Sequence, residues 1–131
     1  MKFQKKMIAD NILYVVEGDL SVTNFFVVDK LCVDIRNSSK IGGYNFIWDL
    51  SKTNLVDSTG LSVIAITIAS AMRDGKKVKL CGVNPDNARL LRISKMGSNI
   101  EQYNHLDEAL ETVANGLPTQ TMELELINEV C

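Results

Sequence analysis

Residues 49–61 have the sequence DLSKTNLVDSTGL, and this stretch joins two apolar segments. The run Tyr44–Leu50, which overlaps the first two residues of this stretch, combines aromatic and β-branched residues and predicts a largely buried strand. After it, apolar residues recur at helical spacing, which predicts a helix with these positions facing inward: Leu61, Ile64, Ala65, Ile68 and Met72. The stretch is therefore predicted to lead from a buried strand, through a polar loop, into an apolar helix.

The same alternation continues on both sides of this stretch. A first helix of about 16 residues is expected after Ser21 as N-cap, with Phe25, Val28, Cys32 and Ile35 inward and Asn37-Ser38-Ser39 as its end. Strands are expected at 2–8, 11–17, 44–50 and 76–83 and around Ile100, and further helices at 61–74, after Asn84-Pro85-Asp86 and from His105 to about Asn115. The order β-β-α-β-α-β-α-β-α predicts an α/β sheet whose strands are joined through helical crossovers.

Length and composition predict one soluble globular domain. The chain has 131 residues, of which 46% are hydrophobic and 23% charged. The uncharged run Leu61–Met72 is 12 residues long, whereas a membrane helix needs about 20. The N-terminal residues MKFQKK lead into mixed polar sequence and do not resemble a signal peptide. We therefore expect a cytoplasmic protein without membrane insertion.

Several classes of site are excluded by residue counts. Three cysteines at wide spacings and a single histidine, His105, form neither a disulfide framework nor a metal pattern. The basic segment Arg73–Lys95 contains no aromatic residue for stacking on bases, which argues against nucleic acid. There is no phosphate-binding G-x-x-x-x-G-K-[ST] loop and no G-x-S-x-G nucleophile elbow, which argues against a GTPase and against a hydrolase.

The C-terminal part of the chain differs in charge from the rest. Residues 96–131 carry seven acidic side chains and no Lys or Arg. Beyond Gly116-Leu117-Pro118, apolar residues alternate at Met122, Leu124 and Leu126. We expect a domain over 1–116 and an acidic extension over 117–131, where an added strand, a short helix and a docking arm remain alternatives.

The segment Asp57-Ser58-Thr59-Gly60 enters the predicted apolar helix. Small polar residues and a glycine at this place can cap the unsatisfied N–H groups of the first turn. The same place suits an anion, because free N–H groups and the positive end of the helix dipole meet there. Ser58 is then an exposed hydroxyl that the fold would allow to be phosphorylated.

These residues resemble the signature of STAS domains, in particular of bacterial anti-sigma-factor antagonists. The resemblance rests on Asp49-Leu50-Ser51 followed by Leu55-Val56-Asp57-Ser58-Thr59-Gly60-Leu61, and on Gly18-Asp19-Leu20-Ser21 as the family's early turn. The family's fourth strand and last two helices match Gly75–Leu80 with Asn84-Pro85, Leu90–Gly97 and Leu106–Leu110, so that the resemblance covers residues 2–115. It implies a STAS fold, with a mixed four- to five-stranded sheet and about four helices packed on it.

The resemblance also implies a function. Unphosphorylated, the chain would bind an anti-sigma factor that is a GHKL-type serine kinase, through Asp57, Ser58, Thr59 and Gly60 and through Asp19 and Ser21 of the early turn. The kinase would phosphorylate Ser58 with ATP and magnesium, and a PP2C-type phosphatase would reverse this. The chain itself would need no cofactor. We expect Gly60, which has no side chain, to let the partner's backbone come close.

Two alternatives belong to the same fold. One is a stand-alone STAS subunit that regulates a membrane transporter, for example in lipid traffic. The other is a sensor that binds a small molecule or nucleotide with the same loop. An intact serine directly after Asp57 favours the phosphorylation switch.

Overall fold

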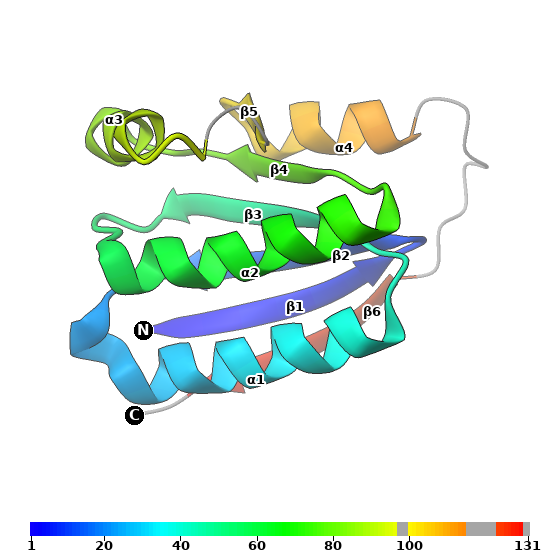
Figure 1. Ribbon diagram of the computed structural model, residues 1–131, viewed down its shortest axis with the longest axis horizontal. Helices are drawn as coiled ribbons and strands as arrows, with labels where there is room; N and C mark the ends of the chain where they lie inside the picture. The colour runs from blue at the N-terminus through cyan, green and yellow to red at the C-terminus, as the bar shows by residue number, and fades with distance from the viewer. Residues whose placement is uncertain (97–99, 115–122, 130–131) are drawn as a thin grey trace.

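The computed structural model describes residues 1–96, 100–114 and 123–129; of 111–114 and 123–129 it describes the backbone alone. The predicted order of elements is present, followed by one more strand (Figure 1). The elements are β1 (Lys2–Ile8), β2 (Asn11–Glu17), the short 3-10 helix η1 (Val22–Asn24), α1 (Phe25–Ile41), β3 (Asn45–Lys52), α2 (Ser58–Asp74), β4 (Val78–Cys81), α3 (Pro85–Ile93), β5 (Ile100–Tyr103), α4 (Leu106–Ala114) and β6 (Glu123–Glu129).

The strands form one mixed sheet in the order β5-β4-β3-β2-β1-β6. β1 and β2 are an antiparallel hairpin, β2 to β5 run parallel, and β6 pairs antiparallel with β1. The expected α/β architecture with a mixed sheet is therefore confirmed. The sheet has one strand more than the four or five expected, because 123–129 of the C-terminal extension is a strand, one of the three alternatives for that segment.

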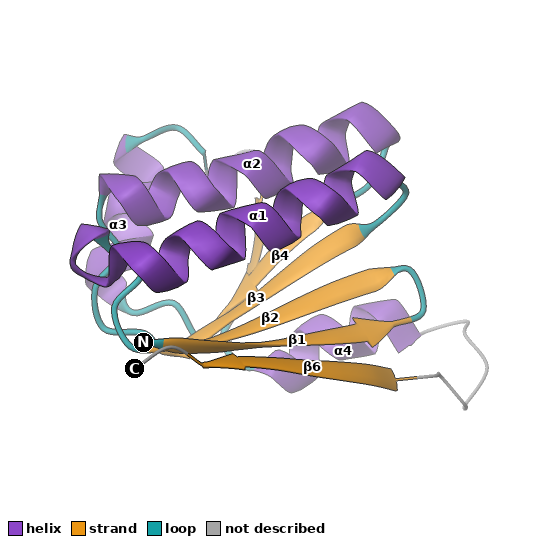
Figure 2. Cartoon of the chain, turned by 90° about the horizontal axis from the view of Figure 1, so that it is seen from below, coloured by secondary structure: helices purple, strands orange, loops and turns teal. Residues whose placement is uncertain are grey.

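Helices cover both faces of this sheet. α1 and α2 lie side by side on one face, and α4 lies on the other (Figure 2). Both α1 and α2 begin at the end of the sheet where β3 and β4 finish, and α3 lies at that same end (Figure 1). The arrangement gathers the loops after the parallel strands at one end of the molecule, which is where α/β proteins place their binding sites.

The main core lies between the sheet and the pair α1 and α2. Its largest fully buried side chains include Trp48, Tyr14 and Phe46. Trp48 donates its indole N–H to Thr67 Oγ1 at 3.1 Å, which satisfies the one polar atom of a buried ring. A smaller cluster on the other face packs Leu13, Ile47 and Cys81 against α4. Burial raises the pKa of the Cys81 thiol to about 12, so that this cysteine stays protonated and unreactive.

The first helix differs from its prediction at both ends. Ser21 makes no capping hydrogen bond, because the chain first forms η1 and α1 starts at Phe25. The inward stripe is then Val27, Val28, Leu31 and Ile35, whereas Phe25 is 57% exposed, so its predicted inward position is wrong. The helix continues past Asn37-Ser38-Ser39 to Ile41, since the buried Ser38 hydroxyl accepts a hydrogen bond from Lys5 at 3.0 Å and is thus satisfied inside the helix.

The later helices agree more closely with their predictions. In α2 the buried apolar residues include Ile64 and Ile68 as predicted, but Ala65 and Met72 point outward. Asn84 caps α3 as predicted, accepting from the Asn87 amide at 2.9 Å. The predicted ends of the last two helices, at Met96-Gly97-Ser98 and near Asn115, lie partly or wholly outside the described residues.

Candidate functional site

Asp57 is the N-cap of α2, and its carboxylate joins two parts of the chain. Oδ1 accepts from the Gly60 amide at 3.1 Å, within the first helical turn. Oδ2 accepts from the Val22 amide at 3.0 Å, in η1. Burial raises the pKa of Asp57, but the backbone N–H groups of Val22, Gly60 and Thr59 outweigh it, and the net pKa lies below its ordinary value. Asp57 is therefore a fixed negative charge at the start of α2.

Ser58 is the first residue of α2, and its side chain is exposed. Within 1–96 and 100–110, where side chains are described, the Ser58 hydroxyl makes no hydrogen bond; only its carbonyl is engaged, accepting from Ser62 Oγ at 2.9 Å. Thr59, the next residue, is half-buried. Ser58 thus presents a free hydroxyl on a backbone that is held on both sides.

The site offers less to an anion than the sequence suggested. Two N–H groups that a phosphate could have used, those of Gly60 and Val22, are occupied by the Asp57 carboxylate. A phosphate on Ser58 would also lie next to that negative charge. Because the Gly60 and Val22 amides are occupied, we expect a phosphate on Ser58 to face the solvent or a partner.

The loop after β2 runs alongside the loop that precedes Ser58. Leu20 and Val56 form an isolated parallel bridge, and the Leu20 amide donates to the Leu55 carbonyl at 2.9 Å. Asp19 Oδ1 accepts from the Leu55 amide at 3.2 Å, so its carboxylate is engaged inside the chain. The structure therefore brings Asp19 close to the Asp57–Gly60 segment, because backbone contacts and the Asp19 side chain join the two loops.

Gly60 is buried where the two loops meet. A Cβ built on Gly60 would collide with the Leu20 carbonyl oxygen and would lie 2.9 Å from Val56 Cγ1. Contact of a partner's backbone with this glycine stays a prediction; the close approach that the structure shows is that of Leu20 in the same chain. Sequence spacing alone could not show it, because Leu20 is 40 positions away in the sequence.

Ser21 has a structural position rather than an exposed one. It is 1% exposed, and its hydroxyl lies 2.6 Å from Thr23 Oγ1. Its side chain holds the turn before η1, so a partner can meet Ser21 only if this turn opens.

Asn87 was missed by the sequence analysis and fixes the loop from the other side. This buried asparagine accepts from the Val56 amide at 3.1 Å and donates to the Asn54 carbonyl at 3.1 Å. Asn84 donates to the same carbonyl at 2.8 Å. The only signal in the sequence was a second asparagine three residues after the predicted cap, which is not specific.

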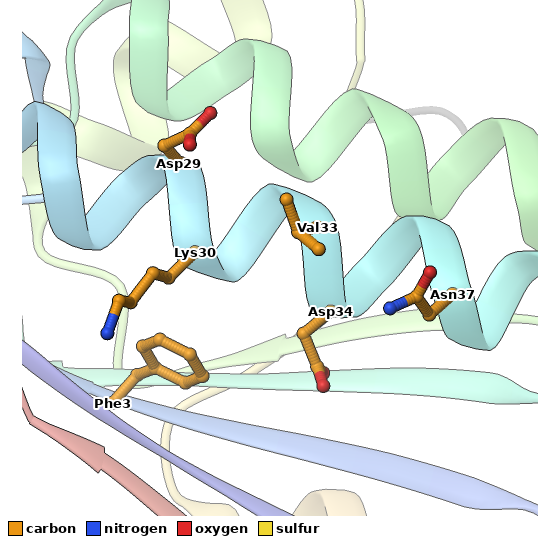
Figure 3. A pocket seen from close by; sticks show the side chains of 6 residues that line it. All are labelled: Phe3, Asp29, Lys30, Val33, Asp34 and Asn37. Carbon is orange, nitrogen blue, oxygen red and sulfur yellow. The ribbon is translucent and has the colours of Figure 1, made fainter.

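A pocket of about 350 Å3 lies elsewhere, between α1 and β1. Figure 3 shows Lys30 and Asp34 extending from α1 towards the strand that carries Phe3. Asp34 is already paired there, with Lys5 Nζ at 3.1 Å and the Tyr14 hydroxyl at 2.7 Å. The pocket shares no residue with the loop around Ser58, so it lends no support to a sensor that uses that loop.

The described residues form neither a metal-binding cluster nor a membrane-spanning helix. No group of three or more His, Cys, Asp or Glu side chains in this part of the chain is placed to hold a metal ion. None of the helices there has the length and hydropathy to cross a bilayer.

The family model of the STAS domain matches residues 3–109. The chain belongs to the STAS domain family. No curated protein matches the chain significantly. The loop around Ser58 lies within the matched residues, as do the described members of both core clusters except Met1 and Leu110.

Several solved structures share the fold. A putative anti-sigma factor antagonist from Thermotoga maritima has a TM-score of 0.74 and 21% identity, over 85% of this chain and 93% of that one. The phosphorylated Bacillus cell fate determinant SpoIIAA has a TM-score of 0.70 and 18% identity, over 85% of this chain and 98% of that one. A sulfate transporter family protein from Wolinella succinogenes has a TM-score of 0.62 and 19% identity, over 82% and 87%. At these identities the likeness establishes the fold.

Proposed function

We propose that this STAS protein is a phosphorylation-switched anti-sigma-factor antagonist. Unphosphorylated, it binds an anti-sigma factor that is a GHKL-type serine kinase; once Ser58 is phosphorylated, the two separate, and a PP2C-type phosphatase restores binding. The observation that carries the proposal is the free, exposed Ser58 hydroxyl on a loop whose neighbours Asp57 and Gly60 are locked. The similarity to a structure named as phosphorylated SpoIIAA supports it.

In this scheme the chain is not an enzyme and carries no cofactor. The ATP and magnesium belong to the kinase, and the chain contributes the accepting hydroxyl. Asp57 already occupies the nearby N–H groups, so the new phosphate gains no internal hydrogen bond from Gly60 or Val22. Folding of the free protein should therefore change little on phosphorylation.

The energy of the switch comes from the interface. A phosphoserine carries a charge of about −1.5 to −2 near neutral pH. Pressed into a partly desolvated interface without a cation to meet it, this charge costs roughly 3–5 kcal/mol. That is about a hundred- to several-thousand-fold in dissociation constant, enough to separate the proteins.

The test measures phosphorylation and binding on a panel of purified GHKL-type serine kinases from the source genome. With ATP and magnesium, intact mass should rise by one phosphate in the wild type and in Thr59→Ala, and stay unchanged in Ser58→Ala. Ser58→Ala should bind the kinase permanently, and Ser58→Asp should bind about a hundredfold more weakly. Tight binding of Ser58→Asp, or a phosphate on Ser58→Ala, would contradict the proposal.

A second candidate is a regulatory subunit of a membrane transporter, favoured by the likeness to the Wolinella succinogenes protein. It predicts that Ser58→Asp leaves the function of the chain unchanged and that no kinase of the panel acts on Ser58. The same mass measurement therefore separates the two candidates.

A further inference from the structure

An aromatic pair is exposed at the start of α1. Phe25 is 57% and Phe26 77% exposed, and their rings meet edge to face with centroids 5.9 Å apart. Val22, one turn earlier, is 57% exposed. We call these three residues the Phe25–Phe26 patch. Single exposed apolar residues are ordinary, but adjacent aromatic rings that face water mark a surface that meets a partner.

The patch has no role in the core of the chain. The residues of α1 that face the sheet are Val27, Val28, Leu31 and Ile35. Rotating the helix to bury Phe26 would bring these residues out into water. The fold therefore keeps the two rings outside.

The patch is attached to the loop that carries Ser58. The Val22 amide is the donor that reaches Asp57 Oδ2 at 3.0 Å, and Asp57 directly precedes Ser58. Figure 1 shows the starts of α1 and α2 at the same end of the molecule. Leu55, 47% exposed, lies on the second of the two paired loops. A partner that covers Ser58 therefore has an apolar surface beside it.

The charges near the patch favour a protein partner over a lipid surface. Residues 18–30 contain Asp19 and Asp29 and one cation, the exposed Lys30. Anionic membranes attract segments rich in Lys and Arg, so this segment is unsuited to them. An apolar protein surface also explains the strength of the switch, because a phosphate beside a desolvated aromatic pair meets no compensating charge.

We propose that Val22, Phe25 and Phe26 are the apolar anchor through which the kinase that acts on Ser58 docks, with their rings in an apolar pocket of that kinase. The inference rests on the proposed function and adds the residues that supply the affinity. Buried aromatic anchors at the centre of an interface are where truncation costs most. The phosphorylation state of Ser58 then determines whether these side chains can bind in that pocket.

The test compares three variants of α1, each of which removes exposed apolar side chains. The double variant Phe25→Ser/Phe26→Ser and the single variant Phe26→Ser remove the anchor. Ile41→Ser, at the other end of α1 and also 77% exposed, is the matched control. Calorimetry measures binding of each unphosphorylated chain to the kinase that phosphorylates Ser58 in the panel. We expect about 30-fold or more weakening for the double variant, less for Phe26→Ser, and a change within about twofold for Ile41→Ser.

Each outcome supports or overturns the anchor. If the double variant keeps its melting temperature and binds like the wild type while Ser58→Asp does not bind, the anchor is wrong and the proposed function stands. If no kinase binds or phosphorylates Ser58, both are wrong. The anchor is also wrong if sedimentation shows a wild-type dimer that the double variant abolishes, or if phosphatidylcholine–phosphatidylglycerol vesicles bind the wild type alone.

Discussion

Asp57 does two things at once at the residue scale. Its Oδ1 caps α2 through Gly60, and its Oδ2 holds η1 through Val22. A local motif usually explains only the first of these, because the second donor is 35 positions away in sequence. The carboxylate thus fixes the backbone on which the Ser58 hydroxyl and the Phe25–Phe26 patch are placed.

We predict that Asp57→Ala lowers the free energy of unfolding by about 1–2 kcal/mol at pH 7, the usual cost of losing an N-cap. The free energy of unfolding of Asp57→Asn should lie between those of the wild type and Asp57→Ala, because an amide has one accepting oxygen and cannot serve both N–H groups. The depressed pKa of Asp57 means that its contribution is present above its ordinary pKa of 3.8 and is lost as the pH falls through the folded value. Urea unfolding at pH 7 and pH 3 should show the gap between wild type and Asp57→Asn closing in acid; an equal gap at both would contradict this.

Much of this site could be predicted from local sequence. The segment from Asp57 to Gly60 shows a cap, a serine and a helix start, and the structure has them in that order. The contacts that fix the loop could not be predicted, since Val22, Leu20 and Asn87 reach it from 31 to 40 positions away. Side chains that act at such separations leave no periodic signal in the sequence.

At the scale of elements, α2 can pack closely against the loop at Leu20 because Gly60 has no side chain. The Leu20 carbonyl occupies the place of a Cβ, so that the first turn of α2 and the Leu20–Val56 bridge lie in direct contact. Helix propensity would favour alanine over glycine here. Packing outweighs this preference and makes alanine destabilising, since the Leu20 carbonyl is a backbone group that cannot rotate away as a side chain could.

We therefore predict that Gly60→Ala destabilises the protein by about 2–3 kcal/mol, as overpacking of a tight contact does. Ser62→Ala, two positions further along α2 and exposed, is the control and should change stability by no more than about 0.5 kcal/mol. Chemical denaturation of both variants measures the difference. If Gly60→Ala is as stable as the wild type but no longer binds the kinase, the stability prediction is wrong and this glycine contacts the partner.

The errors in element prediction have one physical origin. The first helix was expected to end at its polar Asn37-Ser38-Ser39, and Phe25 was expected inside, because only periodicity and composition were available. Lys5 from β1 donates a hydrogen bond to the Ser38 hydroxyl, and α1 begins only at Phe25 because η1 precedes it. Tertiary contacts thus overrode local preference at both ends of one helix.

At the scale of the whole molecule, the order of strands depends on pairings that the sequence does not display. The alternation of elements predicted parallel strands and crossover helices, and β2 to β5 confirm it. The antiparallel pairing of 123–129 with β1 joins residues more than 100 positions apart, so the sequence left the C-terminal extension open between three structures. In the structure this strand covers what would otherwise be a sheet edge.

The domain boundary that we expect at residue 116 leads to the last prediction. β6 pairs with all seven residues of β1, from Lys2 to Ile8, whereas the match to the STAS family model ends at residue 109. We expect a chain of residues 1–116 to fold cooperatively with a melting temperature about 5 °C lower, equivalent to roughly 1 kcal/mol. Circular dichroism during heating measures this.

Removal of β6 also tests how the sheet edge is protected. The shortened chain would expose the backbone of β1, and unpaired edges promote association. Lys2 and Lys6 lie on that strand, and lysines on an edge oppose such pairing, so sedimentation at low micromolar concentration should still show a monomer. Phosphorylation of Ser58 should be retained, because the loops that hold Asp57 and Ser58 bond to Val22, Leu20 and Asn87 and not to β6 in the described chain. If the shortened chain unfolds without cooperativity, residues 117–131 belong to the domain and the boundary at 116 is wrong.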